Sequence, residues 1–214
     1  MKLDKKRLRL YAVTDRAWAA DTDALLRQVA DAIDGGAGIV QLREKHLDKK
    51  AFLEEARRFV ALCREKGALS IINDDVDIAL ASGADGVHVG QEDLAAGRAR
   101  EALGPDKIIG VSAHNADEAL AAQAAGADYL GVGAAFVTGT KADAKPITRE
   151  TLRAVTAAVE IPAVAIGGIT RENLLQLKGC GLQGVAVVSA LFGQPDVKAA
   201  AAELLALSEE MAEN

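Results

Sequence analysis

The sequence predicts an α/β fold, a single (β/α)8 barrel of the TIM type, on three observations. Short, nearly continuous apolar runs recur about eight times along the 214 residues, as is typical of parallel strands buried on both faces. These runs alternate with amphipathic stretches of helical period. The length is a little below the ~250 residues common for a closed barrel of this kind.

Each strand is expected at one of these apolar runs. Four runs follow a glycine that ends a helical, alanine-rich stretch, because glycine tolerates the left-handed conformation found after a helix C-terminus. These glycine-led runs are residues 36–40, 83–87, 126–130 and 181–185. The other runs are residues 10–13, 70–72, 107–111 and 162–166. Helices are expected at residues 22–33, 50–66, 76–81, 116–125, 149–159, 171–178 and 197–211.

A doubly wound open sheet is the alternative architecture for the same alternation of strand and helix. The first strand–helix turn lacks the G-x-G-x-x-G fingerprint that such sheets use for dinucleotides, which disfavours this alternative. No linker or low-complexity stretch divides the chain. We therefore expect residues 1–214 to form one TIM-barrel domain.

The composition argues against several classes of protein. Half of the residues are hydrophobic and 26% are charged, as in an ordinary globular domain. A formal net charge of −6 and only 3% aromatic residues argue against nucleic-acid binding. No apolar run reaches the roughly 18 residues of a membrane helix, and the basic N-terminus lacks the apolar core of a signal peptide. Cys63 and Cys180 lie far apart in the sequence, which favours reduced thiols in the cytoplasm.

Polar side chains follow the expected strands at the points where the strands end. A barrel presents these ends at one mouth, where barrel enzymes carry their chemistry. The polar segments read Gln-Leu-Arg-Glu-Lys at 41–45, Asn-Asp-Asp at 73–75, His-Val-Gly-Gln-Glu-Asp at 88–93, Ser112 with His114, Thr-Gly-Thr-Lys at 138–141, Gly-Gly at 167–168, and Ser189. We therefore expect these segments to converge on one site.

The charges at this mouth predict a metal-bound polyphosphate. Arg43, Lys45 and Lys141 supply cations, and the planar guanidinium of Arg43 suits phosphate oxygens. Asp74 and Asp93 supply carboxylates, which would repel a phosphate unless a cation lay between them. Mg²⁺ favours one or two carboxylates together with phosphate oxygens and water, so the pattern predicts Mg²⁺ and pyrophosphate.

A second anion site is expected on the opposite part of the mouth. It comprises Gly167, Gly168 and the backbone around Val188 and Ser189, which is the usual phosphate position after the seventh and eighth strands of a barrel. Two separate anion sites imply two phosphorylated substrates.

Single members of this set also have structural interpretations. The charges at 43–45 could form a solvated run. Asp74 and Asp93 could each begin a helix, and Asp75 is assigned to a helix cap and left out of the metal site. His88 lies inside an apolar strand, where a hydrogen-bonded core histidine is the commoner role.

Taken together, these segments resemble the thiamine-phosphate synthase family. The landmarks occur in order: Tyr-Ala-Val-Thr-Asp-Arg at 11–16, Gln-Leu-Arg-Glu-Lys at 41–45, Asn-Asp at 73–74, His-Val-Gly-Gln-Glu-Asp at 88–93, Gly-Val-Ser at 110–112, Thr-Gly-Thr-Lys at 138–141, Ala-Ile-Gly-Gly-Ile at 165–169 and Val-Val-Ser-Ala at 187–190. The Ile-Gly-Gly turn occurs in many phosphate-binding barrels, whereas the segments at 41–45, 88–93 and 138–141 together are specific.

The resemblance implies a Mg²⁺-assisted transferase of thiamine biosynthesis. It would join 4-amino-2-methyl-5-hydroxymethylpyrimidine pyrophosphate to 4-methyl-5-(2-hydroxyethyl)thiazole phosphate by a dissociative step, giving thiamine phosphate and pyrophosphate. The implied site has Mg²⁺ ligands Asp74 and Asp93; pyrophosphate contacts Arg43, Lys45, Asn73 and Lys141; pyrimidine contacts Gln41 and Ser112; and thiazole-phosphate contacts Thr138, Thr140, Gly168, Val188 and Ser189. The residues assigned to catalysis are Arg43, Lys45, Lys141 and Ser112.

Two features depart from this pattern or compete with it. Ala134 and Val137 stand where the family commonly has proline, which leaves the loop less restricted. His114 resembles the histidine of thiazole tautomerases, related barrels that isomerise a thiazole carboxylate phosphate and tend to lack the paired acids and the Thr-Lys element. A non-catalytic barrel that binds a phosphorylated ligand is a third hypothesis. Any helix face of a barrel can pair, so a homo-oligomer is also compatible with the sequence.

Overall fold

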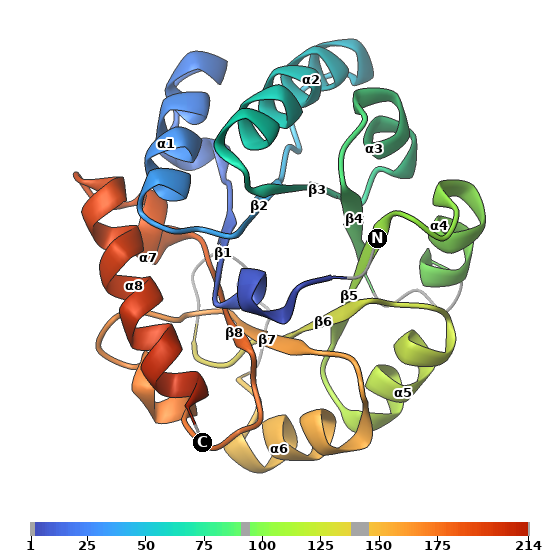
Figure 1. The fold of residues 1–214 in the computed structure, drawn as a ribbon, viewed down its shortest axis with the longest axis vertical. Coiled ribbons are helices and arrows are strands. Elements are labelled where there is room, and N and C mark those ends of the chain that lie inside the picture. Colours follow the sequence, from blue (N-terminus) through green and yellow to red (C-terminus); the bar gives the residue numbers. More distant parts are fainter. Residues whose placement is uncertain (1–2, 91–94, 138–145, 214) are drawn as a thin grey trace.

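The computed structural model describes residues 3–90, 95–137 and 146–213. Its parallel strands close into a barrel in which each strand pairs with the next and β8 pairs with β1 (Figure 1). The strands are β1 (Leu10–Val13), β2 (Ile39–Leu42), β3 (Leu69–Asn73), β4 (Gly86–Val89), β5 (Ile108–Ala113), β6 (Tyr129–Gly133), β7 (Ala163–Ile166) and β8 (Gly184–Val187). The predicted TIM-barrel fold is confirmed.

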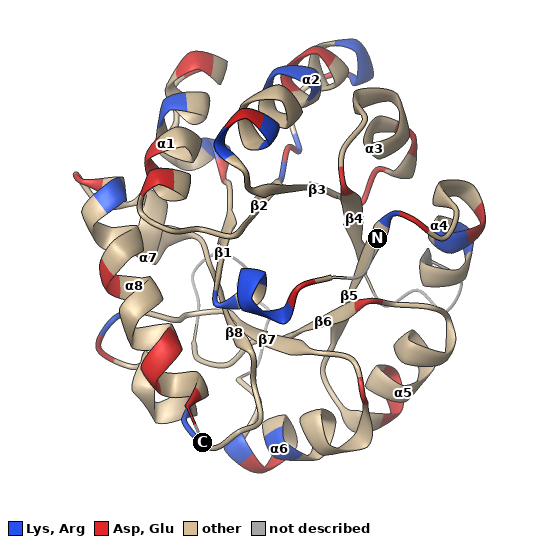
Figure 2. Ribbon diagram, in the orientation of Figure 1, with Lys and Arg blue, Asp and Glu red and all other residues tan. Residues whose placement is uncertain are grey.

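Helices form a ring around the sheet, and most of the charged residues lie on these helices and on the loops (Figures 1 and 2). The α-helices are α1 (Thr22–Asp34), α2 (Lys49–Lys66), α3 (Val76–Ser82), α4 (Ala95–Leu103), α5 (Ala116–Ala124), α6 (Arg149–Ala158), α7 (Ser189–Phe192) and α8 (Val197–Ala212). Single 3₁₀ turns are η1 (Lys5–Leu8), η2 (Arg16–Trp18) and η3 (Leu174–Leu177). Side-chain oxygens cap the first turns of six helices, and the capping residues are Asp21, Asp48, Asp75, Asn115, Thr148 and Asp196.

One predicted helix is wrong, and two helices were not predicted. Residues 171–178 form only the single turn η3, because the Asn173 side chain bonds locally to Thr170 N–H and to the Gly168 carbonyl instead of starting a longer helix. The helix α4 has Gly97 in its first turn, which weakens a sequence-based assignment. The helix α7 has only four residues, too few for a periodic pattern.

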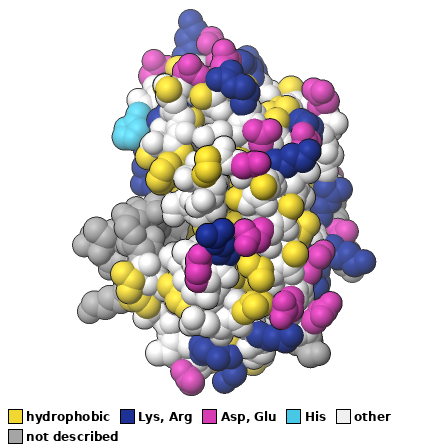
Figure 3. All heavy atoms as spheres, turned by 90° about the vertical axis from the view of Figure 1, so that its left-hand side faces the viewer, with side chains coloured by type: hydrophobic (Ala, Val, Ile, Leu, Met, Phe, Trp, Pro, Cys, Tyr) yellow, Lys and Arg dark blue, Asp and Glu magenta, His cyan; other side chains and the backbone are white. Residues whose placement is uncertain are grey.

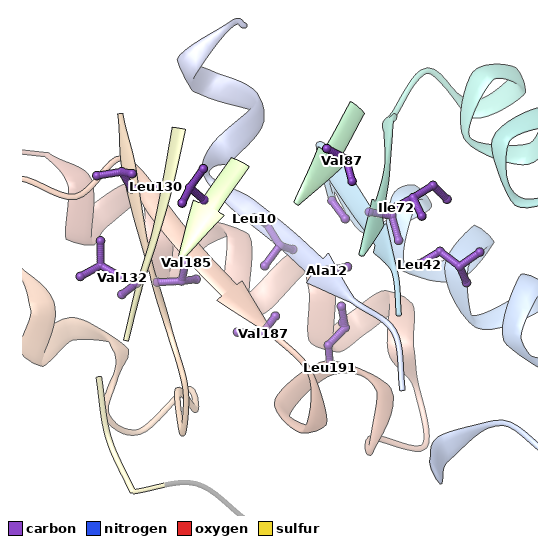
Figure 4. Packing of buried hydrophobic residues seen from close by; sticks show 14 of the residues in the cluster. Leu10, Ala12, Leu42, Ile72, Val87, Leu130, Val132, Val185, Val187 and Leu191 are labelled. Atoms are coloured by element: carbon purple, nitrogen blue, oxygen red, sulfur yellow. The ribbon is translucent and has the colours of Figure 1, made fainter. Parts of the chain in front are cut away.

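The alternation of side chains along the strands separates two layers of core. Leu10 and Ala12 of β1 point outward into the large cluster between the sheet and the helices, which Figure 4 shows from close by. Tyr11 and Val13 of the same strand point inward, into the smaller cluster inside the barrel. Each fully buried large apolar side chain contributes about 1.5–3 kcal/mol, so both layers stabilise the strand ends that carry the site.

The end of the barrel at which the strands begin is covered by the N-terminal segment. The turn η1 lies across the centre of the barrel in Figure 1, and its Leu8 is fully buried in the inner cluster. In the face that carries α1 and α8, apolar side chains are interspersed with charged ones (Figure 3). Within the described residues, no helix combines the length and the apolar character needed to cross a membrane.

Candidate active site

A pocket of about 160 Å³ opens where the strands end. Side chains or backbone from every strand, or from the loop just after it, line its wall. The lining includes seven residues that were predicted from the sequence as site residues: Gln41, Arg43, Asn73, Ser112, Gly168, Val188 and Ser189. The loops of the barrel therefore converge as expected, while the role of each residue stays a prediction.

A second, more open hollow of about 500 Å³ adjoins the first beside β2 and β3. Asn73 lines both hollows, so they share a wall. Lys45 and Asp74 line the second hollow and not the first. The predicted pyrophosphate and metal residues are thus divided between two adjacent spaces that meet at Asn73.

Asp74 has an unusual backbone conformation, and its side chain lines the second hollow. Its φ of 63° lies in the left-handed region, which a non-glycine residue adopts only where the surroundings hold it. Its N–H donates to the His88 carbonyl at 2.8 Å, and its carboxylate accepts a hydrogen bond from Asn73 Nδ2 at 2.6 Å. The next residue, Asp75, caps α3 through Ile78 N–H at 3.0 Å. Asp74 therefore keeps an exposed carboxylate at the hollow.

Two of the three charges that follow β2, those of Arg43 and Glu44, are held by specific partners. Arg43 Nη1 lies 2.9 Å from Asp15 Oδ2, and its guanidinium also lines the pocket. Glu44 accepts hydrogen bonds from Arg16 and from the backbone N–H of His46. Burial opposes ionisation of Glu44, but these hydrogen bonds outweigh it and lower the pKa of the carboxyl. The result is a fixed Arg43 next to an exposed Lys45.

Three residues that line the pocket, Gln41, His88 and Ser112, are joined through two buried tyrosines in a continuous chain of hydrogen-bonded side chains. Gln41 Nε2 lies 2.6 Å from the Tyr11 hydroxyl, which lies 2.7 Å from the Tyr129 hydroxyl. The Tyr129 hydroxyl lies 3.0 Å from His88 Nδ1, and His88 Nε2 lies 3.1 Å from Ser112 Oγ. Burial raises the pKa of both tyrosines, so their hydroxyls stay protonated. We call these five residues the floor chain.

Two glycines make room for the floor chain. A Cβ at Gly110 would lie 2.1 Å from Tyr129 Cζ and 2.5 Å from His88 Nδ1. A Cβ at Gly131 would lie 3.0 Å from His88 Cε1. The contact at Gly110 is closer than real Cβ atoms come, so the rings of Tyr129 and His88 require glycine there, whereas at Gly131 the His88 ring would have to shift by a few tenths of an ångström.

The opposite wall is formed by backbone. Gly167 and Gly168 have φ of 99° and 64°, and a Cβ at Gly168 would lie 2.3 Å from the Val137 carbonyl oxygen, so this turn requires glycine. The α7 helix begins at Ser189, directly after β8. Leu191 N–H and Phe192 N–H donate to the Val188 carbonyl, so the N–H groups that could receive an anion at this end are those of Ser189 and Ala190.

Several sequence-based assignments need comment. Asp93, Thr138, Thr140 and Lys141 lie outside the described residues. His88 is hydrogen-bonded, as expected of a core histidine, but it also lines the pocket, which its apolar strand did not reveal. His114 lines the pocket too, and its Nδ1 lies 3.2 Å from Glu118 Oε2.

Sequence reasoning did not connect Tyr11 with Tyr129. A signal was present, because they are the only two tyrosines in the chain and each lies in an apolar run. Only the barrel closure brings β1 and β6 across from one another, with ring centroids 5.7 Å apart.

Comparisons with known proteins agree with this geometry. Residues 10–191 match the family model described as thiamine monophosphate synthase. The chain belongs to this family. A thiamine-phosphate synthase of Ruminiclostridium cellulolyticum is 50% identical over 196 residues, which cover 92% of this chain and 93% of that protein. A thiamine-phosphate synthase of Moorella thermoacetica is 53% identical over 180 residues, which cover 84% and 86% of the two chains.

A solved structure from the same family has the same fold. The thiamine phosphate pyrophosphorylase from Pyrococcus furiosus superimposes with a TM-score of 0.87 and is 40% identical, covering 98% of this chain and 99% of that one. Family membership and the full-length barrel therefore agree with the resemblance drawn from the strand-end segments.

Proposed function

We propose that this chain is a thiamine phosphate synthase. It joins 4-amino-2-methyl-5-hydroxymethylpyrimidine pyrophosphate to 4-methyl-5-(2-hydroxyethyl)thiazole phosphate, and it releases pyrophosphate. The observation that carries this proposal is the convergence of seven predicted substrate residues on one pocket in a chain that is about half identical to thiamine-phosphate synthases. In this proposal, residues 1–214 form one catalytic domain. The enzyme acts in the cytoplasm, and its substrates are small molecules.

The residues beside β3 fit a magnesium ion. Within the described residues, no group of three His, Cys, Asp or Glu side chains could hold a metal by itself. Mg²⁺ does not require such a group, because one or two carboxylates suffice when substrate phosphates and water complete its shell. The exposed Asp74 carboxylate would be one ligand, and Asp93, outside the described residues, would be the other. When bound, Mg²⁺ neutralises charge on the pyrophosphate.

The chemistry follows from the charges at the mouth. The bond between the pyrimidine methylene and the pyrophosphate oxygen breaks, and the thiazole nitrogen then forms a bond to that methylene. The positive charges of Arg43 and Lys45 stabilise the negative charge that grows on the leaving pyrophosphate. Lys141 carries the same charge and has the same role in this proposal. The pyrimidine lies against Gln41 and Ser112, and the thiazole phosphate lies against Gly168, Val188 and Ser189, with Thr138 and Thr140. The protein also accelerates the reaction by holding the thiazole nitrogen in line with the pyrimidine methylene, so no protein nucleophile is needed.

One observation favours a second candidate. His114 lines the pocket, and a thiazole tautomerase would need a histidine there to move a proton. The presence of Arg43, Lys45, Asn73 and Asp74 along the two adjoining hollows favours the synthase, because a tautomerase has no pyrophosphate to bind.

The test is a coupling assay with purified protein, both phosphorylated precursors, and Mg²⁺ present or chelated. Thiamine phosphate that forms only with Mg²⁺ supports the proposal. A folded protein that forms no thiamine phosphate but isomerises the thiazole carboxylate phosphate would establish the tautomerase instead.

A further inference from the structure

Two consecutive residues that follow β1 hold the segment that follows β2. The Asp15 carboxylate lies 2.9 Å from Arg43 Nη1. The next residue, Arg16, contacts Glu44 Oε2 with its Nε at 3.0 Å and its Nη2 at 2.7 Å. The segment held in this way carries Arg43 and Lys45, which the proposed function assigns to pyrophosphate.

We propose that Arg16 is a positioning residue for pyrophosphate. Arg16 holds Glu44, and Glu44 holds the backbone from which the Lys45 side chain extends, so that the lysine is already directed at the substrate. The inference rests on the proposed function, since it concerns the pyrophosphate of that reaction. Arg16 is not among the described residues that line the two hollows, so its effect on the substrate is indirect.

The Glu44 carboxylate links the Arg16 guanidinium to the backbone. Its Oε1 accepts hydrogen bonds from Lys45 N–H and His46 N–H, both at 2.7 Å, while its Oε2 accepts those of Arg16. The Glu44 side chain is only 1% exposed, so water is poorly placed to replace a lost partner. Because both oxygens are engaged, the carboxylate cannot turn at one end without breaking hydrogen bonds at the other. A displacement of Arg16 is therefore transmitted to the backbone of residues 45 and 46.

A buried carboxylate of α2 anchors Arg16 in turn. Arg16 Nη2 lies 2.5 Å from Glu55 Oε2, and the Thr22 hydroxyl donates to the same oxygen. The Glu55 side chain is 2% exposed, and its Oε1 has no hydrogen-bond partner among the described residues. Burial of such a carboxylate is costly, and the positive charge of Arg16 offsets that cost. A lysine at position 16 would offer one nitrogen where Arg16 uses two, so the planar guanidinium suits this place.

The charges around Arg16 explain why it does not bind phosphate itself. Its one positive charge faces two carboxylates, Glu44 and Glu55, and these three groups together would repel a pyrophosphate. Arg43 and Lys45 differ from Arg16, because the first lines the pocket and the second lines the adjoining hollow. The cationic contacts thus belong to Arg43 and Lys45, and Arg16 keeps the carboxylate between them in place.

Lys45 benefits most from a fixed backbone. Its side chain is exposed and flexible, and the ordering of such a side chain on binding reduces affinity. A main chain that is already in place at Lys45 removes part of that cost before the substrate arrives. Loss of Arg16 should therefore weaken pyrophosphate binding mainly through Lys45.

The first experiment measures the binding of inorganic pyrophosphate to the full chain by calorimetric titration in the presence of Mg²⁺. Arg16→Met removes the guanidinium and keeps an unbranched apolar stem. We expect the dissociation constant of pyrophosphate to rise about tenfold, within the range of interaction energies found in one hydrogen-bond network. In the coupling assay, KM for the pyrimidine pyrophosphate should rise by a similar factor, while KM for the thiazole phosphate stays within about twofold of the wild-type value.

A double-mutant cycle separates positioning from a general structural role. Lys45→Ala alone should also weaken pyrophosphate binding. If Arg16 acts through Lys45, the variant with both Arg16→Met and Lys45→Ala binds pyrophosphate as Lys45→Ala does, because no lysine side chain remains to be positioned. Losses that multiply would overturn the proposal, since Arg16 would then affect pyrophosphate independently of Lys45.

A milder variant keeps the test valid if Arg16→Met does not fold. That substitution leaves two buried carboxylates without their cation, which is destabilising. Glu55→Gln weakens the anchor of Arg16 and leaves the pairing of Arg16 with Glu44 in place. We expect it to weaken pyrophosphate binding about threefold, the effect of one weakened hydrogen bond, and to have no effect in the Lys45→Ala background. An unchanged affinity in folded Glu55→Gln protein would overturn the role of the anchor.

The control is Arg58→Met. Arg58 of α2 pairs with Asp23 of α1 at 2.5 Å on the surface, so it also ties α2 to a neighbouring element, but it has no contact with the segment after β2 among the described residues. We expect this variant to keep the wild-type affinity for pyrophosphate. A loss as large as that of Arg16→Met would overturn the proposal, because any loosening of α2 would then suffice.

The same measurements distinguish failure of this inference from failure of the proposed function. A wild-type protein that binds pyrophosphate but forms no thiamine phosphate would refute the proposed function, while the titrations would still decide whether Arg16 positions Lys45. A wild-type protein that binds no pyrophosphate in the presence of Mg²⁺ would refute both.

Discussion

The floor and the rim of the pocket differ in burial and in charge. Tyr11, Tyr129 and Gln41 of the floor chain are buried, its five side chains are joined by hydrogen bonds, and Gly110 and Gly131 lie beside its rings. The rim, formed by Arg43, Lys45, Asn73 and Asp74, is charged and partly exposed, and it lies on the segments that follow β2 and β3. Charge can act through water over several ångströms, whereas a neutral hydrogen bond works only at contact distance and in one direction.

Because of this difference, we expect mutations in the rim and in the floor to have different effects. A change at the rim should affect the reaction while leaving the fold intact, because exposed groups add little packing energy. A change at the floor should affect stability, because the tyrosine rings of the floor chain fill the inside of the barrel.

The largest expected effect is at the rim, at Asp74. Asp74→Asn removes the charge while keeping a residue type that tolerates the left-handed φ of 63°. We expect kcat to fall about 10²–10³-fold, the range found when one charge-stabilising group is lost, with an unchanged melting temperature. The measurement is steady-state turnover as a function of Mg²⁺ concentration.

The matched control for this variant is the neighbouring aspartate. Asp75 caps α3, so Asp75→Ala should lower stability by about 1 kcal/mol and retain most of the turnover. Equal losses of turnover in the two variants would contradict the assignment of metal binding to Asp74 and capping to Asp75.

The next largest effect is expected at Arg43. Arg43→Ala should lower kcat about 10²-fold, and Arg43→Lys should recover only part of it, because lysine lacks the planar fork that pairs with phosphate oxygens and with Asp15 at 2.9 Å. Turnover is measured over a range of salt concentrations. A lysine variant with wild-type kcat would show that charge alone is needed at this position.

The contrast between floor and rim also explains what could be predicted from the sequence. Rim residues are strand-end polar segments such as the one at 41–45, and their type and position along the chain suffice to bring them together once a barrel is assumed. The floor depends on inward-facing residues of β1, β4 and β6, whose contacts appear only when the barrel closes. His88 therefore looked like a core residue, since the sequence does not show that Tyr129 faces it.

The same reasoning applies to the secondary structure. The eight strands could be predicted because buried parallel strands are continuous apolar runs. The turn η3 was predicted as a helix because residues 171–178 have a helical apolar pattern, and the local bonds of Asn173 override it. The spacing of apolar residues along the sequence does not reveal side-chain contacts of this kind.

A floor variant should show its effect mainly in stability. In Gly110→Ala, the new Cβ would lie 2.1 Å from the Tyr129 ring, so we expect a loss of about 1–3 kcal/mol from the displaced rings. Gly97→Ala is the control, because nothing lies within 4 Å of a Cβ at this helical position. We expect that variant to gain about 0.5–1 kcal/mol. Urea unfolding of both proteins measures the difference, and a Gly110→Ala protein as stable as the wild type would show that the floor can rearrange.

The smallest effect is expected at His114, where the pocket meets solvent. Its side chain is 51% exposed and pairs with Glu118 at 3.2 Å, and the coupling reaction needs no proton transfer from it. We therefore expect His114→Ala to keep kcat within about threefold in the coupling assay. A tautomerase that used this imidazole as its base would instead lose about 10²–10⁴-fold. The size of the loss in this one variant thus separates a pocket that works by charge and position from one that works by proton transfer.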